Sequence, residues 1–253
     1  MAEFPLQRLL PDAAATSVSE QIESLDLVAA APADRPYVVT NFVLTLDGHA
    51  TLHGRSGLIG SDVDTAMLVG LRTRVDAVMI GAGTMRAERY GRIFTKPERR
   101  EERERQGFAG DPLMVLVSGR MDLPWDAPLF TDGGGKVLIV TVADEDPPPT
   151  ETEVIVERHE NEVDLRALMQ TLRRDHGIRA LLSEGGPRLH ADMSEAGVVD
   201  ELFITHAPKL GGGVGPGLVA GLEEEERPVE IAWLLADEAT GELFGRYRVL
   251  GAG

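Results

Sequence analysis

Apolar runs that end in turns recur along the chain and predict the strands of a buried sheet. Such runs occupy residues 37–46, 75–80, 113–117, 137–142, 153–156, 178–182 and 199–205. Apolar side chains at helical spacing predict helices between several of them, at residues 62–74, 163–176 and 188–196. Strands that alternate with helices in this way predict the α/β class, with a mixed, mostly parallel sheet and helices on both of its faces.

The two ends of the chain depart from this alternation. The last two apolar runs, 229–235 and 243–250, have no helical pattern between them and predict a C-terminal antiparallel hairpin at the sheet edge. Residues 1–35, with one helical pattern near 19–28, predict an N-terminal arm that lies on a single domain formed by residues 36–253. The charged run 96–106 predicts a solvated surface segment.

Charge and composition narrow the classes of partner. The net charge of −17 over 253 residues argues against nucleic acid or an anionic membrane as the main partner. The lack of cysteine excludes thiolate chemistry, and the six histidines have no ligand spacing, so we expect no metal. No apolar run reaches the roughly 20 residues of a membrane span, and no secretion signal is recognisable, which predicts a cytoplasmic protein.

Two junctions between a strand and a turn carry the candidate chemistry. One reads Glu184-Gly185-Gly186-Pro187-Arg188-Leu189, and the other reads Gly81-Ala82-Gly83-Thr84. A helix that starts after such a turn directs backbone N–H groups at one point, which favours an anion. Each turn alone is more often structural, and the third glycine of a dinucleotide fingerprint would fall at Arg86. Because ligands bind at the carboxyl ends of parallel strands, the two together predict a nucleotide-phosphate site.

A third junction and two carboxylates add to this site. Ser118-Gly119-Arg120 follows a predicted strand and suits a 2′-phosphate, although a plain turn with a surface arginine is an equal alternative. Glu184 ends a buried strand, where a charge is unfavourable unless it has a purpose. Asp64 lies in the first turn of a helix that Ser61 or Asp62 can cap, where an acid also stabilises the helix dipole.

Taken together, these blocks resemble the reductase family of riboflavin biosynthesis, which forms the C-terminal half of the bifunctional deaminase–reductase RibD. The matching blocks follow the family's order at residues 41–48, 56–57, 71–72, 76–84, 184–187, 197–202 and 207–212. The resemblance implies a dihydrofolate-reductase-like fold, NADPH as the hydride donor and a homodimer. It also implies a ribosylaminopyrimidine 5′-phosphate as the substrate, reduced at the ribose C1′.

The resemblance also assigns residues. Four residues would lie beside the cofactor: Thr45, Leu58, Thr84 and Glu88. The cofactor's diphosphate would be held by Gly186, Pro187, Arg188 and Leu189, and its adenosine ribose would face Ser118 and Gly119. To the cofactor set we add, from the turns and from charge alone, Gly81, Gly83, Gly185 and Arg120. Substrate-contacting positions match Ser56, Arg72 and Glu184. Glu184 is also a candidate catalytic residue, as is Asp64, by analogy with the acid that binds the pterin in dihydrofolate reductases.

One segment departs from the family pattern. After Thr84 the family usually reads Asp-Asp/Asn-Pro-x-Leu-x-x-Arg, whereas residues 88–95 here read Glu-Arg-Tyr-Gly-Arg-Ile-Phe-Thr. The arginine that grips the substrate phosphate has no clear counterpart, although Arg92 or Lys96 can substitute for it. The deaminase half is also missing. A pterin or dihydrofolate reductase on the same fold, and a non-catalytic nucleotide-binding protein, therefore stay open as alternatives.

Overall fold

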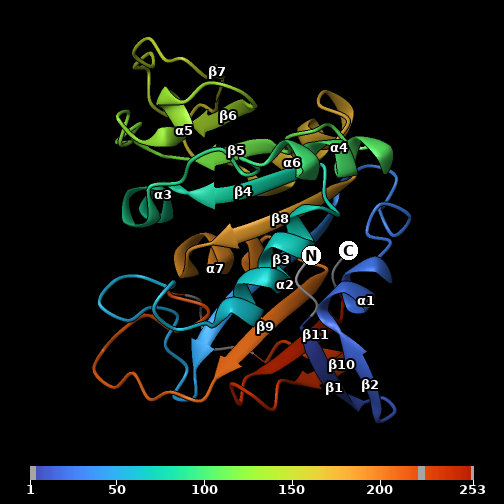
Figure 1. Cartoon of the computed structure of the whole chain (residues 1–253). Helices are drawn as coiled ribbons and strands as arrows, with labels where there is room; N and C mark the ends of the chain where they lie inside the picture. The colour runs from blue at the N-terminus through green and yellow to red at the C-terminus, as the bar shows by residue number, and fades with distance from the viewer. Residues whose placement is uncertain (1–3, 222–225, 252–253) are drawn as a thin grey trace.

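The computed structural model describes residues 4–221 and 226–251, and its strands form one 11-stranded sheet (Figure 1). Most of the acidic stretch at 223–226 lies outside these residues. The strands are β1 (Pro5–Leu10), β2 (Ala14–Ser17), β3 (Tyr37–Thr45), β4 (Ala77–Gly81), β5 (Leu113–Val117), β6 (Lys136–Thr141), β7 (Glu153–Arg158), β8 (Ala180–Gly185), β9 (Glu201–Ala207), β10 (Val229–Ala236) and β11 (Leu243–Val249). Their order in space is β2-β1-β10-β11-β9-β3-β8-β4-β5-β6-β7.

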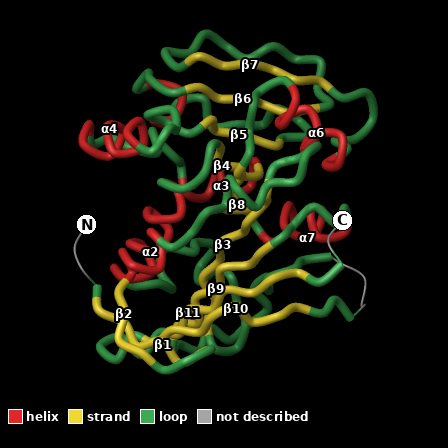
Figure 2. Tube along the Cα trace, turned by 90° about the vertical axis from the view of Figure 1, so that its right-hand side faces the viewer, coloured by secondary structure: helices red, strands yellow, loops and turns green. Residues whose placement is uncertain are grey.

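Helices cover both faces of this sheet. They are α1 (Val18–Glu23), α2 (Asp62–Arg72), α3 (Ala82–Glu88), α4 (Pro97–Arg105), α5 (Pro128–Thr131), α6 (Leu165–Arg174) and α7 (Pro187–Glu195). Figure 2 shows α2 and α4 on one side of the stacked strands and α6 and α7 on the other. Consecutive strand residues enter different cores, since Val38 packs in the cluster that holds Leu168 of α6, whereas Val39 packs with Met67 of α2. Burial on both faces explains the nearly continuous apolar runs of the central strands.

The predicted fold class is confirmed. The seven strands from β9 to β7 in the spatial order pair in parallel, and β11, β10, β1 and β2 continue the sheet in antiparallel fashion. The C-terminal hairpin of β10 and β11 forms as predicted, but its place at the sheet edge was wrong. It lies inside the sheet, because β11 pairs with β9 and β10 pairs with β1.

The N-terminal segment is part of the sheet rather than an arm lying on the domain. Gln7 of β1 pairs with Ala236 of β10, and β2 forms the outer edge beyond β1 (Figure 1). The helix expected near 19–28 is the shorter α1, which begins after its cap, Ser17. These two strands are short, and their apolar residues do not alternate regularly with polar ones, so their sequence carries little strand signal. Their pairing covers backbone groups of β10 that would otherwise form an open edge.

The charged run 96–106 also differs from its prediction, because it forms α4 and buries one of its arginines completely. Arg103 has 0% relative exposure, and its guanidinium lies 5.6 Å from the ring centre of Phe94 and 5.1 Å from that of Phe108. It donates hydrogen bonds to the carbonyls of Ala109 at 2.9 Å and Arg72 at 2.6 Å. Charge density alone gave no sign that this helix has an inward side.

Candidate active site

A cleft of about 600 Å³ opens at the carboxyl ends of the central parallel strands. This volume lies within the range of small-molecule sites. Its walls come from β3, β4 and β8, the start of α2, α3, the start of α7 and the loop before α2. The two predicted junctions meet here, since Ile80 of β4 pairs with Gly185 of β8 and both turns line the cleft.

The second junction is shaped by glycine. Gly185 and Gly186 have φ values of +60° and +39°, a region that side chains rarely adopt. A Cβ on Gly186 would also lie 2.9 Å from the hydroxyl oxygen of Thr84. Helix α7 starts directly after this turn with Pro187, and its N-cap Gly186 makes no side-chain capping bond. The first backbone N–H groups of α7 are therefore available to an anion.

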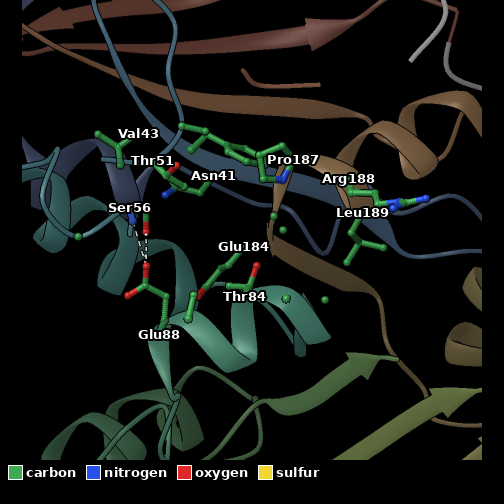
Figure 3. A pocket seen from close by; sticks show the side chains of 18 of the residues that line it. Asn41, Val43, Thr51, Ser56, Thr84, Glu88, Glu184, Pro187, Arg188 and Leu189 are labelled. Atoms are coloured by element: carbon green, nitrogen blue, oxygen red, sulfur yellow. Dashed lines mark hydrogen bonds between the residues drawn. The ribbon is translucent and has the colours of Figure 1, made fainter. Parts of the chain in front are cut away.

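The loop before α2 is fastened to the end of α3. The backbone N–H and the hydroxyl of Ser56 both donate to one carboxylate oxygen of Glu88, at 3.0 and 3.1 Å (Figure 3). The family resemblance implies a substrate contact for Ser56 and a cofactor contact for Glu88, and the structure joins the two side chains. This contact fixes the position of the loop residues that form one wall of the cleft.

An ion pair and a phenol meet at the carboxyl end of β8. The Nε and Nη2 atoms of Arg72 each donate at 2.6 Å to a different oxygen of Glu184, whose side chain is only 4% exposed. The hydroxyl of Tyr90 donates to Oε2 of the same carboxylate at 2.8 Å. Sequence reasoning missed Tyr90, whose only signal was its place in the segment that departs from the family pattern.

The charges of this group follow from its surroundings. Burial alone would lower the pKa of Arg72, but the Glu184 carboxylate outweighs it and raises that pKa. Burial, aided by the Glu184 charge, raises the pKa of Tyr90 well above its ordinary value. Near neutral pH, Arg72 is therefore a cation and Tyr90 a neutral phenol.

Asp64 is a second carboxyl group of the cleft, in the first turn of α2. The N-cap of α2 is Ser61, one of the two residues predicted for that role. Asp64 lines the cleft, although only 9% of the residue is exposed. Within the described residues its Oδ1 atom has no hydrogen-bond partner. Burial raises the pKa of Asp64 to about 6. A hydrogen bond with the Thr205 hydroxyl lowers this pKa, and the nearby charge of Glu242 raises it further. An acid with this pKa can transfer a proton near neutral pH.

The structure gathers most of the predicted site residues. Those that line the cleft are Ser56, Asp64, Gly81, Gly83, Thr84, Glu88, Gly119, Glu184, Gly185, Gly186, Pro187, Arg188 and Leu189. The side chain of Arg188 extends away from the other labelled side chains (Figure 3). Predicted residues outside the lining are Thr45, Leu58, Arg72, Ser118 and Arg120.

These outer residues differ in their surroundings. Thr45 is buried and donates to Asp47 at 2.6 Å, while Leu58 is 52% exposed. Ser118 is buried, and the exposed Arg120 follows it in a loop beyond β5. Arg92, a proposed substitute for the phosphate-gripping arginine, is already paired with Asp111.

Comparison with known proteins identifies the family. The RibD C-terminal domain matches residues 36–236. The chain belongs to this family. The 2,5-diamino-6-ribosylamino-4(3H)-pyrimidinone 5′-phosphate reductase of Archaeoglobus fulgidus is 32% identical over 183 residues, which span 71% of this chain and 83% of that protein. The counterpart from Methanothermobacter thermautotrophicus is 31% identical over 71% of this chain and 81% of its own. Through these relatives, the chain is an oxidoreductase of the riboflavin-pathway type.

A solved structure shares the fold over nearly its full length. The pyrimidine reductase-like protein of Corynebacterium diphtheriae matches with a TM-score of 0.76 at 23% identity, over 92% of this chain and 98% of its own. In residues 4–221 and 226–251, no helix has the length and apolar character needed to cross a membrane. The same described residues contain no group of three or more His, Cys, Asp or Glu side chains suited to a metal ion.

Proposed function

We propose that this protein is an NADPH-dependent reductase that converts the ribosyl group of a ribosylaminopyrimidine 5′-phosphate into a ribityl group. The observation that carries the proposal is one cleft lined both by the glycine turn before α7 and by Asp64, a buried acid whose Oδ1 has no hydrogen-bond partner in the described part of the chain. Two relatives that match this chain over most of their own length are named as reductases of such a phosphate. A cofactor and a substrate would then meet within one cavity.

The residues of the cleft fit a nicotinamide dinucleotide. The open N–H groups of α7 and the turn at Gly185 and Gly186 offer a cradle for the diphosphate, where a side chain on Gly186 would crowd Thr84. Gly81, Gly83 and Thr84 would flank the cofactor from the neighbouring strand end. Ser118, Gly119 and Arg120 follow β5 and would face the adenosine ribose and its 2′-phosphate. When bound, NADPH would supply the hydride.

The protein must then position the acceptor carbon and hold a proton. As C1′ gains a hydride and its bond to the ring oxygen O4′ breaks, that oxygen gains a proton. Asp64 is the group best suited to deliver it, since its pKa is raised to about 6 and its Oδ1 is unpartnered within the described residues. Glu184 is held by three hydrogen bonds, so its role is to bind and orient the substrate.

A pterin or dihydrofolate is the second candidate substrate. The observation that favours it is again Asp64, because a buried carboxyl in the first turn of a helix suits the amino and ring nitrogens of a pterin. The engagement of Arg92 with Asp111 also removes one candidate grip for a phosphate. Both substrates carry an aminopyrimidine ring, so turnover must decide between them.

Calorimetric titration with NADPH and with NADH is the first test, followed by NADPH oxidation with each substrate. We expect micromolar binding of NADPH with a clear preference over NADH, and turnover of the ribosylaminopyrimidine phosphate. Turnover of dihydrofolate alone would support the pterin alternative. Binding of neither nucleotide would overturn the reductase proposal and favour a protein that has lost its redox role.

We also propose a homodimer, which rests on the resemblance to the family. Light scattering during size-exclusion chromatography should give twice the mass of a single chain. A monomer mass at micromolar concentration would contradict this assembly without affecting the proposed chemistry.

A further inference from the structure

Tyr90 lies in the cleft, and the structure fixes its position from both sides. Arg89, just before it, ends α3 in the left-handed conformation with φ +48°, and its backbone N–H donates to the carbonyl of Met85 at 3.0 Å. The carbonyl of Tyr90 accepts a hydrogen bond of 2.9 Å from the N–H of Leu129 in α5. The main chain thus turns sharply after α3 and directs the phenol to Glu184.

The hydrogen bonds around Glu184 account for nearly all of its capacity. Among the residues that the structure describes, Oε2 accepts from Arg72 Nη2 and from the Tyr90 hydroxyl, while Oε1 accepts from Arg72 Nε alone. A carboxylate has about four acceptor sites, so one site remains, on Oε1. The Tyr90 hydroxyl has given its hydrogen to Glu184 and keeps only its capacity to accept, part of which the neighbouring Arg72 guanidinium takes up.

The surface that faces the cleft therefore offers acceptors. Tyr90 and Glu184 line the cleft, whereas Arg72 does not and lies with its guanidinium carbon 5.7 Å from the Tyr90 ring centre. The charge of Arg72 is neutralised by the carboxylate that it binds. A phosphate placed against this wall would meet acceptors where it needs donors.

We propose that Tyr90 is a specificity-determining residue, which together with Glu184 binds two hydrogen-bond donors of the substrate and turns its phosphate away. The inference rests on the proposed function and refines it. The donors are hydroxyl groups of the ribose or an exocyclic amine of the pyrimidine. Arg72, expected from the sequence to contact the substrate, is instead a positioning residue that holds Glu184.

The test compares Tyr90→Phe with Tyr37→Phe as a matched control. Tyr37 also interacts with a glutamate, Glu201, but it lies at the start of β3, the opposite end of the strand from the cleft. Loss of one ligand hydrogen bond should raise the KM of Tyr90→Phe for the ribosylaminopyrimidine phosphate about three- to tenfold, with kcat within twofold. The dissociation constant for NADPH should be the same in both variants and in the wild type.

Substrate analogues identify the donors. If the ribose supplies them, a 2′-deoxyribosyl analogue should raise the KM of the wild type but not that of Tyr90→Phe further. If the amine supplies them, the 2′-deoxyribosyl analogue should raise the KM of the wild type and of Tyr90→Phe by the same factor. An analogue without the exocyclic amine should then raise the KM of the wild type but not that of Tyr90→Phe further. Removal of the 5′-phosphate should weaken the wild type and Tyr90→Phe by the same factor.

The outcomes separate this inference from the proposed function. An unchanged KM in Tyr90→Phe, with normal NADPH binding and turnover, would overturn the role of Tyr90 alone. A phosphate effect that disappears in Tyr90→Phe would also overturn it, because the phosphate would then lie against the phenol. Failure of the wild type to bind NADPH would overturn the proposed function and this inference together.

Discussion

Nη1 of Arg103 donates a hydrogen bond of 2.6 Å to the backbone carbonyl of Arg72, the last residue of α2. The side chain of Arg72 in turn binds both oxygens of Glu184 in the cleft. A fully buried arginine of α4 thus holds the end of the helix that supplies the active-site cation. The carbonyls at a helix end need such partners, because they have none within the helix.

Arg103→Lys should therefore destabilise the fold. The lysine keeps the charge but loses the planar fork that serves two carbonyls and lies near the rings of Phe94 and Phe108. We expect a loss of about 1–3 kcal/mol in the free energy of unfolding, measured by urea denaturation. Arg105→Lys, at an exposed site of the same helix, is the control. Equal stabilities of the two variants would refute the structural role of Arg103.

This arginine illustrates which features the sequence reveals. The periodicity of apolar residues located the central strands, α2, α6 and α7, because each buries a stripe or a whole run of side chains. Arg103 lies among charged neighbours, and its buried site is completed by the carbonyl of Arg72, 31 positions away, and by the rings of Phe94 and Phe108 just outside the charged run. A partner as far along the chain as Arg72 leaves no trace in the composition around Arg103.

The candidate site shows the same division. The glycine turn at 185–186 was visible locally, because its backbone geometry demands those residues. Tyr90 was not visible, because its role depends on Glu184, which is 94 positions away along the chain. The N-terminal strands were missed for a similar reason, since β1 is defined by its pairing with β10 near the other end of the sequence.

Glu184→Gln should bind NADPH normally but lose turnover. The amide cannot neutralise Arg72, so the buried cation loses its ion pair and the orientation of the cleft wall is disturbed. We expect kcat/KM to fall at least 100-fold, on the order of 3 kcal/mol, with the NADPH dissociation constant unchanged in calorimetry. Glu195→Gln, at the end of α7, provides a control. Wild-type turnover in Glu184→Gln would exclude the proposed role of this carboxylate.

Ser56 and Glu88 should be energetically coupled. Because one oxygen of Glu88 accepts from both the N–H and the hydroxyl of Ser56, the effects of Ser56→Ala and Glu88→Ala should not add. A double-mutant cycle of unfolding free energies should give a coupling energy of about 0.5–1.5 kcal/mol. Simple additivity of the two single variants would show that the contact does not fasten the loop in solution.

Asp64 should determine the pH dependence of activity. Because its pKa is raised to about 6, the proton that it donates is lost as the pH rises above that value. The kcat/KM of the wild type should fall tenfold per pH unit well above pH 6, and Asp64→Asn should lack this limb and be about 100-fold slower or more. Asp62→Asn, at an exposed position of the same helical turn, should keep the wild-type profile. A profile of Asp64→Asn that coincides with that of the wild type would rule out Asp64 as the acid.

Stability should respond to Asp64 independently of any substrate. Because the folded-state pKa is raised above the ordinary value of 3.8, the folded protein is more stable with Asp64 neutral than with Asp64 ionised. Its contribution is fully present below about pH 4 and is lost as the pH rises through about 6. Asp64→Asn, neutral at every pH, should therefore gain stability relative to the wild type between pH 4 and 7, by up to about 3 kcal/mol. Urea unfolding across this interval measures the difference, and a constant difference would contradict the burial of an ionisable group at this position.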